Sequence, residues 1–326
     1  MKKSLLALAV LGTIAGAAQA QSSVTLSGGV DLAVRRVGTA TGHDWNMATS
    51  GSSRSNFTLS GTEDLGGGMK AIFLLNHRFR PNDGAINVAG NSATQTPPYF
   101  WRNSWVGLAG GFGDVRLGRI LMPLQDFNGG FEPWGGGDTV AGVVHTGGIQ
   151  ATVRATNTIY YRSPSLGGLQ LHAAIAAGEG QIAAECGCTP INAERPMGLG
   201  VRYDAGPLSA AIAYDKNTAD RATLGLYGKY NMGFATFFGQ YEKGDTSATT
   251  EVDRWSLSAT MPFGAAVAKV GYSNRSDENN KRFALGLDYN LSKRTTLYTD
   301  FSKVSGNGAT TAAKKAQFDV GVWHRF

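Results

Sequence analysis

Residues 315–326, KAQFDVGVWHRF, alternate apolar and polar side chains up to a final aromatic residue. Because successive side chains of a β-strand point to opposite faces, period-two alternation predicts a strand. Terminal segments are usually poorly ordered unless something holds them. We therefore predict that this strand pairs with another part of the chain. One face would carry Phe318, Val320, Val322, His324 and Phe326, and the other Asp319, Gly321, Trp323 and Arg325.

Residues 1–20, MKKSLLALAVLGTIAGAAQA, are typical of a secretory signal peptide. They contain two lysines, an apolar run from Leu5 to Ala18, and small residues at Ala18 and Ala20 that suit signal cleavage. The apolar run is shorter than the roughly 20 residues with which a helix spans a bilayer. We predict that residues 1–20 are removed on export and that residues 21–326 form one domain beyond the inner membrane.

The charge and composition exclude some classes of protein. The formal charge of +6 includes the two lysines of the signal peptide, and no basic run or nucleic-acid-binding motif accompanies it. A solvated surface or a charged pore is therefore favoured over nucleic-acid binding. The 45 glycines and 17% charged residues suit either a secreted all-β protein or a transmembrane β-barrel. A barrel spreads its lipid-facing residues over alternate positions of many strands, so its mean hydropathy stays moderate.

Strand number and loop lengths separate these two alternatives. Short turn sequences such as DLGGG, NMG and LSK alternate with longer polar connections, which is the pattern of an outer-membrane barrel with periplasmic turns and external loops. An even number of strands would leave both ends of the chain on the periplasmic side. The sixteen predicted strands cover residues 24–35, 54–64, 69–80, 100–109, 113–121, 154–163, 167–177, 197–205, 207–215, 221–231, 233–242, 252–262, 264–274, 282–292, 294–302 and 314–326.

The alternation within these strands predicts an apolar outside and a wet interior. In residues 282–292, for example, Phe283 and Leu285 would face lipid while Arg282 and Asp288 face inward. A polar interior indicates a water-filled lumen. Closing the barrel requires the last strand to pair with the first, because free edges cannot lie in lipid. This accounts for the regular pattern up to Phe326.

Several stretches resemble the Gram-negative trimeric general porins over essentially the whole mature length. They are SSVTLSGGVDLAV, GTEDLGGGMKAIF, WRNSWVGLAGGFGDVRLGR, TNTIYYRSPSLGGLQL, LSKRTTLYTDFSKVS and VGVWHRF. The resemblance implies an outer-membrane homotrimer of transmembrane 16-stranded antiparallel β-barrels with an inward-folded constriction loop. It also implies contact with outer-membrane lipid and lipopolysaccharide, no cofactor, and recognition of the terminal residue Phe326 by the barrel assembly machinery. Small hydrophilic solutes and ions would diffuse through without chemical change.

The longest connection, residues 120–153, would be the constriction loop. Its acids are Asp126, Glu132 and Asp138, and its segment EPWGGGD is similar to the tip of the family's constriction loop. The resemblance therefore places these three carboxylates at the pore. The alternative interpretation is that they are solvated loop acids or turn residues.

Arginines are expected on the wall opposite this loop. Arg102 and Arg154 match the family's motif positions, and Arg119 matches the arginine at the entry to the loop. Arg119 would point outward by simple alternation, so its lumen position requires a bulge. Where the family usually has an arginine, this chain has Asn56, and Arg54 lies two residues away on the same predicted face. Each arginine could instead be a solvated charge at the rim.

Acids facing arginines across a narrow water column create a transverse field that orients solutes and selects ions. We predict a passive diffusion channel with a weak preference for anions and no enzymatic step. The alternatives are an outer-membrane hydrolase and a surface adhesin, although no nucleophile motif supports the former. Cys186 and Cys188 lie in one loop, where a disulfide is favoured slightly over a metal site.

Overall fold

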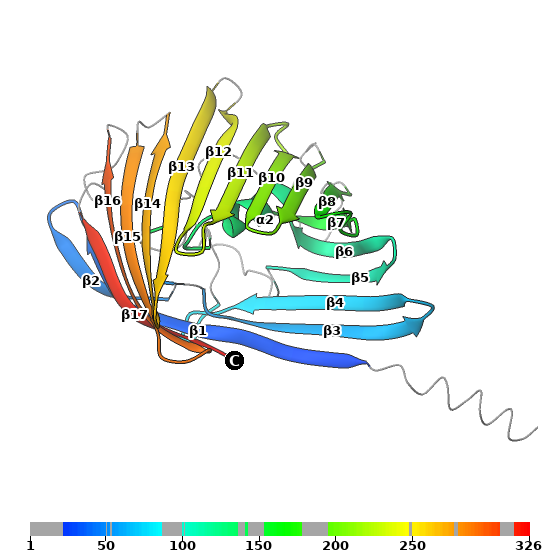
Figure 1. The fold of residues 1–326 in the computed structure, drawn as a ribbon, viewed down its shortest axis with the longest axis horizontal. Helices are drawn as coiled ribbons and strands as arrows, with labels where there is room; N and C mark the ends of the chain where they lie inside the picture. Colours follow the sequence, from blue (N-terminus) through cyan, green and yellow to red (C-terminus); the bar gives the residue numbers. More distant parts are fainter. Residues whose placement is uncertain are drawn as a thin grey trace, which may run out of the picture.

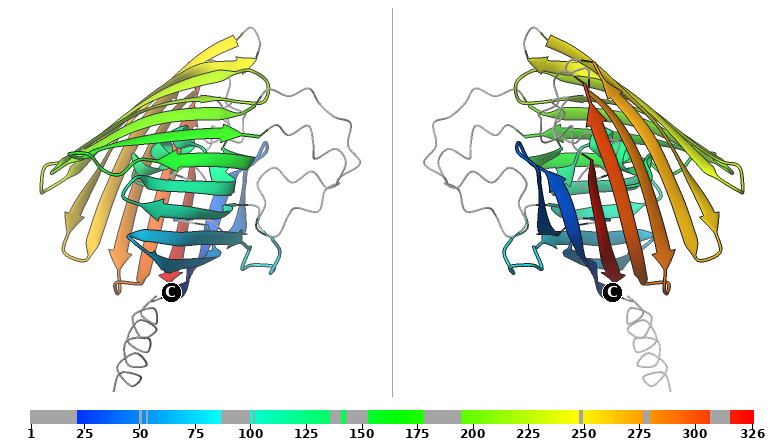
Figure 2. Two further views of the ribbon diagram at one scale, coloured as in Figure 1. Left: turned by 90° about the vertical axis from the view of Figure 1, so that its right-hand side faces the viewer. Right: turned by 90° about the vertical axis from the view of Figure 1, so that its left-hand side faces the viewer.

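The structure, a computed structural model, describes residues 22–49, 51–52, 54–86, 100, 102–135, 141–142, 153–177, 195–247, 250–276, 280–306 and 316–326. Seventeen strands in these ranges form one antiparallel sheet that closes on itself (Figures 1 and 2). Their bounds are β1 Ser23–Gly38, β2 His43–Ala48, β3 Asn56–Gly66, β4 Met69–Arg78, β5 Ser104–Gly110, β6 Gly113–Leu121, β7 Arg154–Arg162, β8 Leu169–Ala176, β9 Met197–Ala205, β10 Leu208–Lys216, β11 Ala222–Asn231, β12 Thr236–Ser247, β13 Thr250–Phe263, β14 Ala266–Arg275, β15 Asn280–Asn290, β16 Thr295–Ser305 and β17 Gln317–Arg325.

The sheet is a sixteen-stranded barrel because β2 and β3 are two parts of one barrel strand. The upper half of β1, from Ala33 to Gly38, pairs with β2, and its lower half, from Ser23 to Gly29, pairs with β3. This confirms the predicted fold. The sequence pattern did not predict β2, since the chain between the two parts leaves the sheet.

The barrel closes between its first and last strands. β17 pairs with β1 from Phe318 opposite Arg36 to Arg325 opposite Gly29. The ladder continues at Phe326, whose N–H donates to the carbonyl of Gly28 at 3.0 Å, and the Gly28 N–H donates back at 3.1 Å. The predicted seam is therefore present, and it leaves no free edge between these strands.

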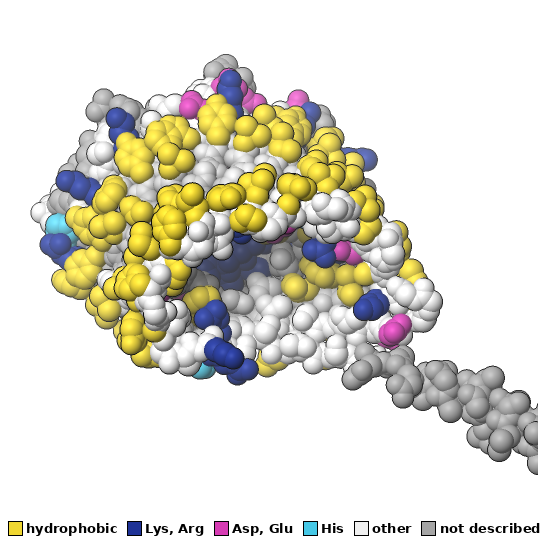
Figure 3. Space-filling model, in the orientation of Figure 1, with side chains coloured by type: hydrophobic (Ala, Val, Ile, Leu, Met, Phe, Trp, Pro, Cys, Tyr) yellow, Lys and Arg dark blue, Asp and Glu magenta, His cyan; other side chains and the backbone are white. Residues whose placement is uncertain are grey.

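The two faces of the sheet differ in chemistry as predicted. On β13, Leu257 is 62% exposed on the outer face, whereas its neighbours Ser256 and Ser258 are 4% and 8% exposed on the inner face. On β15, the outward side chains include Phe283 and Leu285, both well exposed. Hydrophobic side chains form broad bands on the outer surface, and Lys and Arg side chains lie deep in the hollow of the barrel (Figure 3). An apolar outside of this extent is what a lipid-facing barrel requires.

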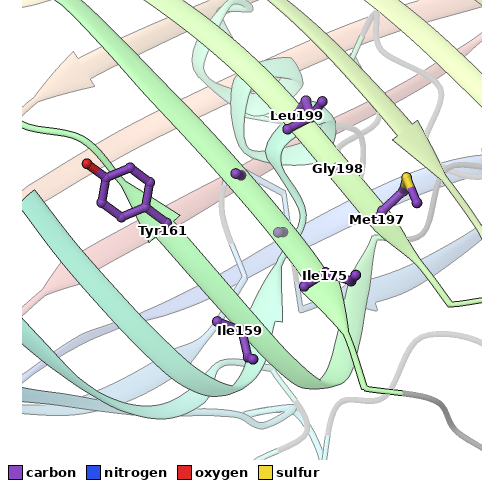
Figure 4. Close-up of a pocket in the computed structure, with 8 residues that line it drawn as sticks. Ile159, Tyr161, Ile175, Met197, Gly198 and Leu199 are labelled. Carbon is purple, nitrogen blue, oxygen red and sulfur yellow. The ribbon is translucent and has the colours of Figure 1, made fainter.

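A shallow apolar pocket of about 320 Å³ lies on β7, β8 and β9. Its lining includes Ile159, Ile175, Met197 and Leu199. In Figure 4 these side chains stand on one side of the strands, and helix α2 (Pro123–Gly130) lies on the other. The pocket therefore belongs to the lipid-facing surface and not to the lumen.

Helix α2 lies inside the barrel, against β8 to β11 (Figure 1). Pro123 opens it, in the first turn, where proline's missing N–H costs no helical hydrogen bond. Leu124 and Phe127 are buried against the wall. Gly198 and Gly200 on β9 make this close approach possible, because a Cβ at either position would overlap Pro123 or Phe127. No helix among the described residues is long and apolar enough to cross a membrane.

Candidate pore constriction

In the connection between β6 and β7, the described residues 122–135 and 141–142 fold into the lumen; we call them the inner loop. Its first turn is fixed by Asp215 of β10, whose carboxylate accepts the N–H of Leu124 at 3.3 Å. Further along, the side-chain amide of Gln240 on β12 donates to the carbonyls of Asn128 and Phe131, at 3.0 and 2.8 Å. These bonds satisfy backbone groups that a loop inside a protein would otherwise leave unpaired.

Glu242 of β12 is the centre of this anchorage. The carboxylate is buried, accepts hydrogen bonds from Asn128 and from the Tyr227 hydroxyl, and forms an ion pair with Arg254 of β13. A buried carboxylate is costly unless it is paired and hydrogen-bonded. Glu242 is therefore a strong constraint on where the inner loop can lie.

The inner loop reaches across to the later strands. Its Trp134 donates its indole N–H to Asp300 of β16 at 2.8 Å, and Arg282 of β15 donates to the carbonyl of Gly142 at 2.7 Å. Phe131 is fully buried, with its ring 5.7 Å from that of Tyr227. The inner loop thus covers the wall from β8 to β16 and leaves the wall from β3 to β7 facing it.

Five arginines gather on or beside that remaining wall, namely Arg54, Arg78, Arg102, Arg119 and Arg154, and we call them the arginine cluster. Arg102 lies just before β5, and the charges of Arg154, Arg54 and Arg119 act on it, while Arg78 is affected by Arg102, Arg54 and Arg154. Burial, reinforced by these neighbouring positive charges, lowers the pKa of Arg102. The structure therefore brings together all four arginines predicted from the sequence.

Arg78 is the member that sequence reasoning missed. It is directly opposite Asn56 in the pairing of β4 with β3, so a guanidinium from the neighbouring strand stands beside the position where the family usually has an arginine. The signal was available, because Asn76 and Arg78 share one face at the end of a predicted strand. The side chain of Asn56 donates to the carbonyl of Arg54 at 2.7 Å.

A bulge lies next to Arg119. The pairing of β6 with β7 shifts register between Gly118 and Ile120, and Asn157 on β7 has a positive φ of 51°. A β-bulge changes the direction in which the following side chains point. The charge of Arg119 acts on Arg102 and Arg154. The bulge thus lies where a lumen position of Arg119 requires it.

The predicted acids occupy different environments. Asp126 on α2 is under the influence of four arginines, at positions 116, 202, 162 and 154. Glu132 is only 6% exposed, and its charge acts on Arg282 of the wall behind the inner loop. Asp138 lies outside the described residues, as do Cys186 and Cys188. Among the described acids of the inner loop, Asp126 is therefore the one directed toward the arginine-bearing wall.

We expect the charge of Asp126 to make the ion selectivity of the channel dependent on pH. Burial raises the pKa of its carboxyl, and the nearby arginines oppose this rise without cancelling it. As the pH falls through this raised pKa, a negative charge is lost beside the arginines, so the preference for anions should increase. As the pH is lowered, the increase should begin above the pH at which an ordinary aspartate is protonated.

Reversal potentials of the wild type and Asp126→Asn, measured in a salt gradient over a pH series, test this. At neutral pH the variant should have the reversal potential that the wild type has in acid. Its reversal potential should no longer change over the pH range in which Asp126 titrates. Identical curves for the two proteins would show that Asp126 does not titrate at the pore.

Other basic residues extend the positive lumen. The side chain of Arg116 on β6 pairs with Asp114 at 2.6 Å and lies 4.7 Å from the centre of the Trp105 ring. Arg202 on β9 lies 5.5 Å from the ring of Phe131 in the inner loop and pairs with Asp204 at 2.7 Å. These rings and carboxylates hold the long side chains in place along the lumen. No group of three or more potential metal ligands occurs in the described ranges.

A closed barrel with an apolar outer face, a polar lumen, and an inner loop facing a wall of arginines defines an outer-membrane pore. Comparison with known families agrees: the model of the Gram-negative porin family matches residues 7–309. The chain belongs to this family and is an outer-membrane porin channel, as predicted, and the hydrolase and adhesin alternatives are not favoured.

Individual relatives extend over nearly the whole chain. The outer membrane porin protein 32 of Delftia acidovorans is 35% identical, over 97% of this chain and 93% of its own length. An outer membrane porin protein of Bordetella pertussis is 28% identical over the full length of both. Among solved structures, an anion-selective porin from Comamonas acidovorans is 32% identical, covers 94% of this chain and all of its own, and superimposes with a TM-score of 0.77.

Proposed function

We propose that this porin is a passive diffusion channel that prefers anions. The observation that carries the proposal is the arginine cluster of Arg54, Arg78, Arg102, Arg119 and Arg154 opposite the inner loop. Cationic side chains in a water column with low-dielectric walls raise the local concentration of anions. The similar Comamonas protein, which is described as anion-selective, supports the same direction.

The solutes would be small, hydrophilic and chemically unchanged by passage. The inner loop fills part of the lumen with the bulky side chains of Phe127, Phe131 and Trp134, which narrows the path. The carboxylate of Asp126 and the guanidiniums of the arginine cluster would orient dipolar solutes across this narrow section. No cofactor and no covalent step enter the proposal.

Liposome swelling with solutes of matched size and different charge tests this function. Vesicles that contain the purified protein should swell in small sugars, swell faster in small organic anions than in organic cations, and exclude large oligosaccharides. Equal rates for anions and cations would remove the anion preference. The absence of swelling in small sugars would contradict the diffusion channel itself.

Assembly and partners follow the resemblance and are part of the proposal. Residues 1–20 would direct export as a signal peptide, Phe326 would be recognised by the barrel assembly machinery, and three copies would form a homotrimer. Lipopolysaccharide would contact the external end of the barrel, where Lys281 and Lys303 are exposed on the outer face. Cross-linking in outer membranes and heat-modified gel mobility would test the trimer.

A further inference from the structure

Between β2 and β3, the described residues 49, 51–52 and 54–55 leave the sheet and lie on the lumen side of the wall. This short passage, which we call the inner segment, carries Arg54 of the arginine cluster. Residues of β1 and β16 hold it, so strands that carry none of the clustered arginines control the position of one of its charges.

Asp31 of β1 is the main attachment. Its side chain is fully buried and accepts hydrogen bonds from the backbone N–H of Ser52 at 2.9 Å and from the hydroxyl of Tyr298. The Asp31 backbone binds the same segment, because its N–H donates to the Ser55 hydroxyl at 2.8 Å and that hydroxyl donates to the Asp31 carbonyl at 3.1 Å. A buried carboxylate requires such donors, so the segment and Asp31 stabilise each other.

Tyr298 of β16 supports this attachment through packing. Its ring clusters with Ala33 and Ala48, near Trp323. Gly51 lies directly on the ring, and a Cβ at this position would overlap the Tyr298 hydroxyl and its ring carbons. The inner segment can therefore approach the wall this closely only with glycine at position 51.

Arg54 lies between two attached residues, Ser52 and Ser55, so its backbone has little freedom. From this position its charge acts on Arg78, Arg102 and Arg154. Releasing the inner segment would leave those three arginines in place, because they lie on or next to β4, β5 and β7. Only the contribution of Arg54 to the field would change.

We propose that Asp31 and Tyr298 are positioning residues for ion selection: they hold the inner segment so that Arg54 adds its charge to the arginine cluster. The proposal rests on the anion preference proposed above and assigns part of it to a specific contact. Neither residue needs to touch the permeating ion.

A double-mutant cycle with Tyr298→Phe and Arg54→Ser tests the route of this effect. Tyr298→Phe removes the hydroxyl that donates to Asp31 and should shift the reversal potential toward cations, in the same direction as Arg54→Ser. In the Arg54→Ser background it should cause no further shift. An equal shift in both backgrounds would overturn the proposal. Tyr289→Phe, which changes an exposed lipid-facing tyrosine, is the matched control and should leave the potential unchanged.

Thiol labelling provides a readout that does not depend on selectivity. Arg54→Cys is made with Cys186→Ser and Cys188→Ser, and its reaction rate with a small charged methanethiosulfonate is followed as a fall in conductance. Adding Tyr298→Phe or Gly51→Ala should raise this rate several-fold, since each loosens the inner segment. Unchanged labelling rates in both variants would show that Tyr298 and Gly51 do not hold the inner segment in place. Faster labelling without a shift in reversal potential would show that holding the segment has no role in ion selection. A wild type without anion preference would contradict the proposed function but not the labelling result.

Discussion

Replacing Arg102 and Arg154 together by serine is expected to abolish most of the preference for anions proposed for the channel. Both guanidiniums lie in the arginine cluster, and Arg154 is further fixed by donating to the side chain of Asn103 at 3.2 Å. Removing two cations from a narrow, low-dielectric passage weakens the field far more than removing two from a surface. The reversal potential in a salt gradient should therefore move strongly toward cations.

The matched control removes two charges outside the lumen. Lys293 and Arg294 are exposed in the short turn between β15 and β16, and Lys293→Ser with Arg294→Ser changes the net charge by the same amount. This control should shift the potential little, and less at high salt, because exposed charges are screened. Equal shifts in the two double variants would mean that net charge and not the arginine cluster sets selectivity.

Deleting residues 130–134 is expected to widen the channel and raise its single-channel conductance several-fold. The deletion removes Phe131, which packs on Tyr227 of β11, and Trp134, which packs on Ala284 of β15 and donates to Asp300 of β16. Its ends can be joined with little strain, since a Cβ at Gly129 would lie only 3.4 Å from the carbonyl oxygen of Gly135. Larger sugars should then enter liposomes at measurable rates.

The strands should still close in this deletion variant, because the ladders of β1 to β17 do not involve the inner loop. Heat-modified gel mobility checks that the barrel is folded. As a control, Trp134→Phe keeps an aromatic ring but removes the donor to Asp300 and should change conductance much less. A folded deletion variant with wild-type conductance and size limit would show that the inner loop does not narrow the path.

The fold could be predicted from the sequence because each strand carries its own signal. Alternation such as that of Trp255, Leu257 and Met261 with serines reports both the strand and its outer face. The interruption between β2 and β3 could not be predicted in this way. It depends on Asp31 and Tyr298, which are distant in the sequence, and their contacts with Ser52 and Ser55 exist only in the folded barrel.

The site was accessible to sequence reasoning only in part. Resemblance indicated Arg102, Arg119 and Arg154 and gave no role to Arg78, which the structure adds to the cluster and which shares a face with Asn76 at the end of a predicted strand. The sequence did not indicate which acid of the inner loop lies nearest the arginine cluster. Asp126 is directed toward the arginines and Glu132 toward Arg282 because of how α2 packs on β8 to β11, and this packing has no local sequence signal.

The most direct test of the account is the reversal potential of the purified wild-type protein in a planar bilayer with a potassium chloride gradient. An open, water-filled channel lined by the arginine cluster should conduct in discrete steps. Its reversal potential should lie between zero and the equilibrium potential of chloride. That preference should weaken as the salt concentration rises and screens the arginine charges. A reversal potential between zero and the equilibrium potential of potassium at neutral pH, or no discrete conductance, would contradict the account.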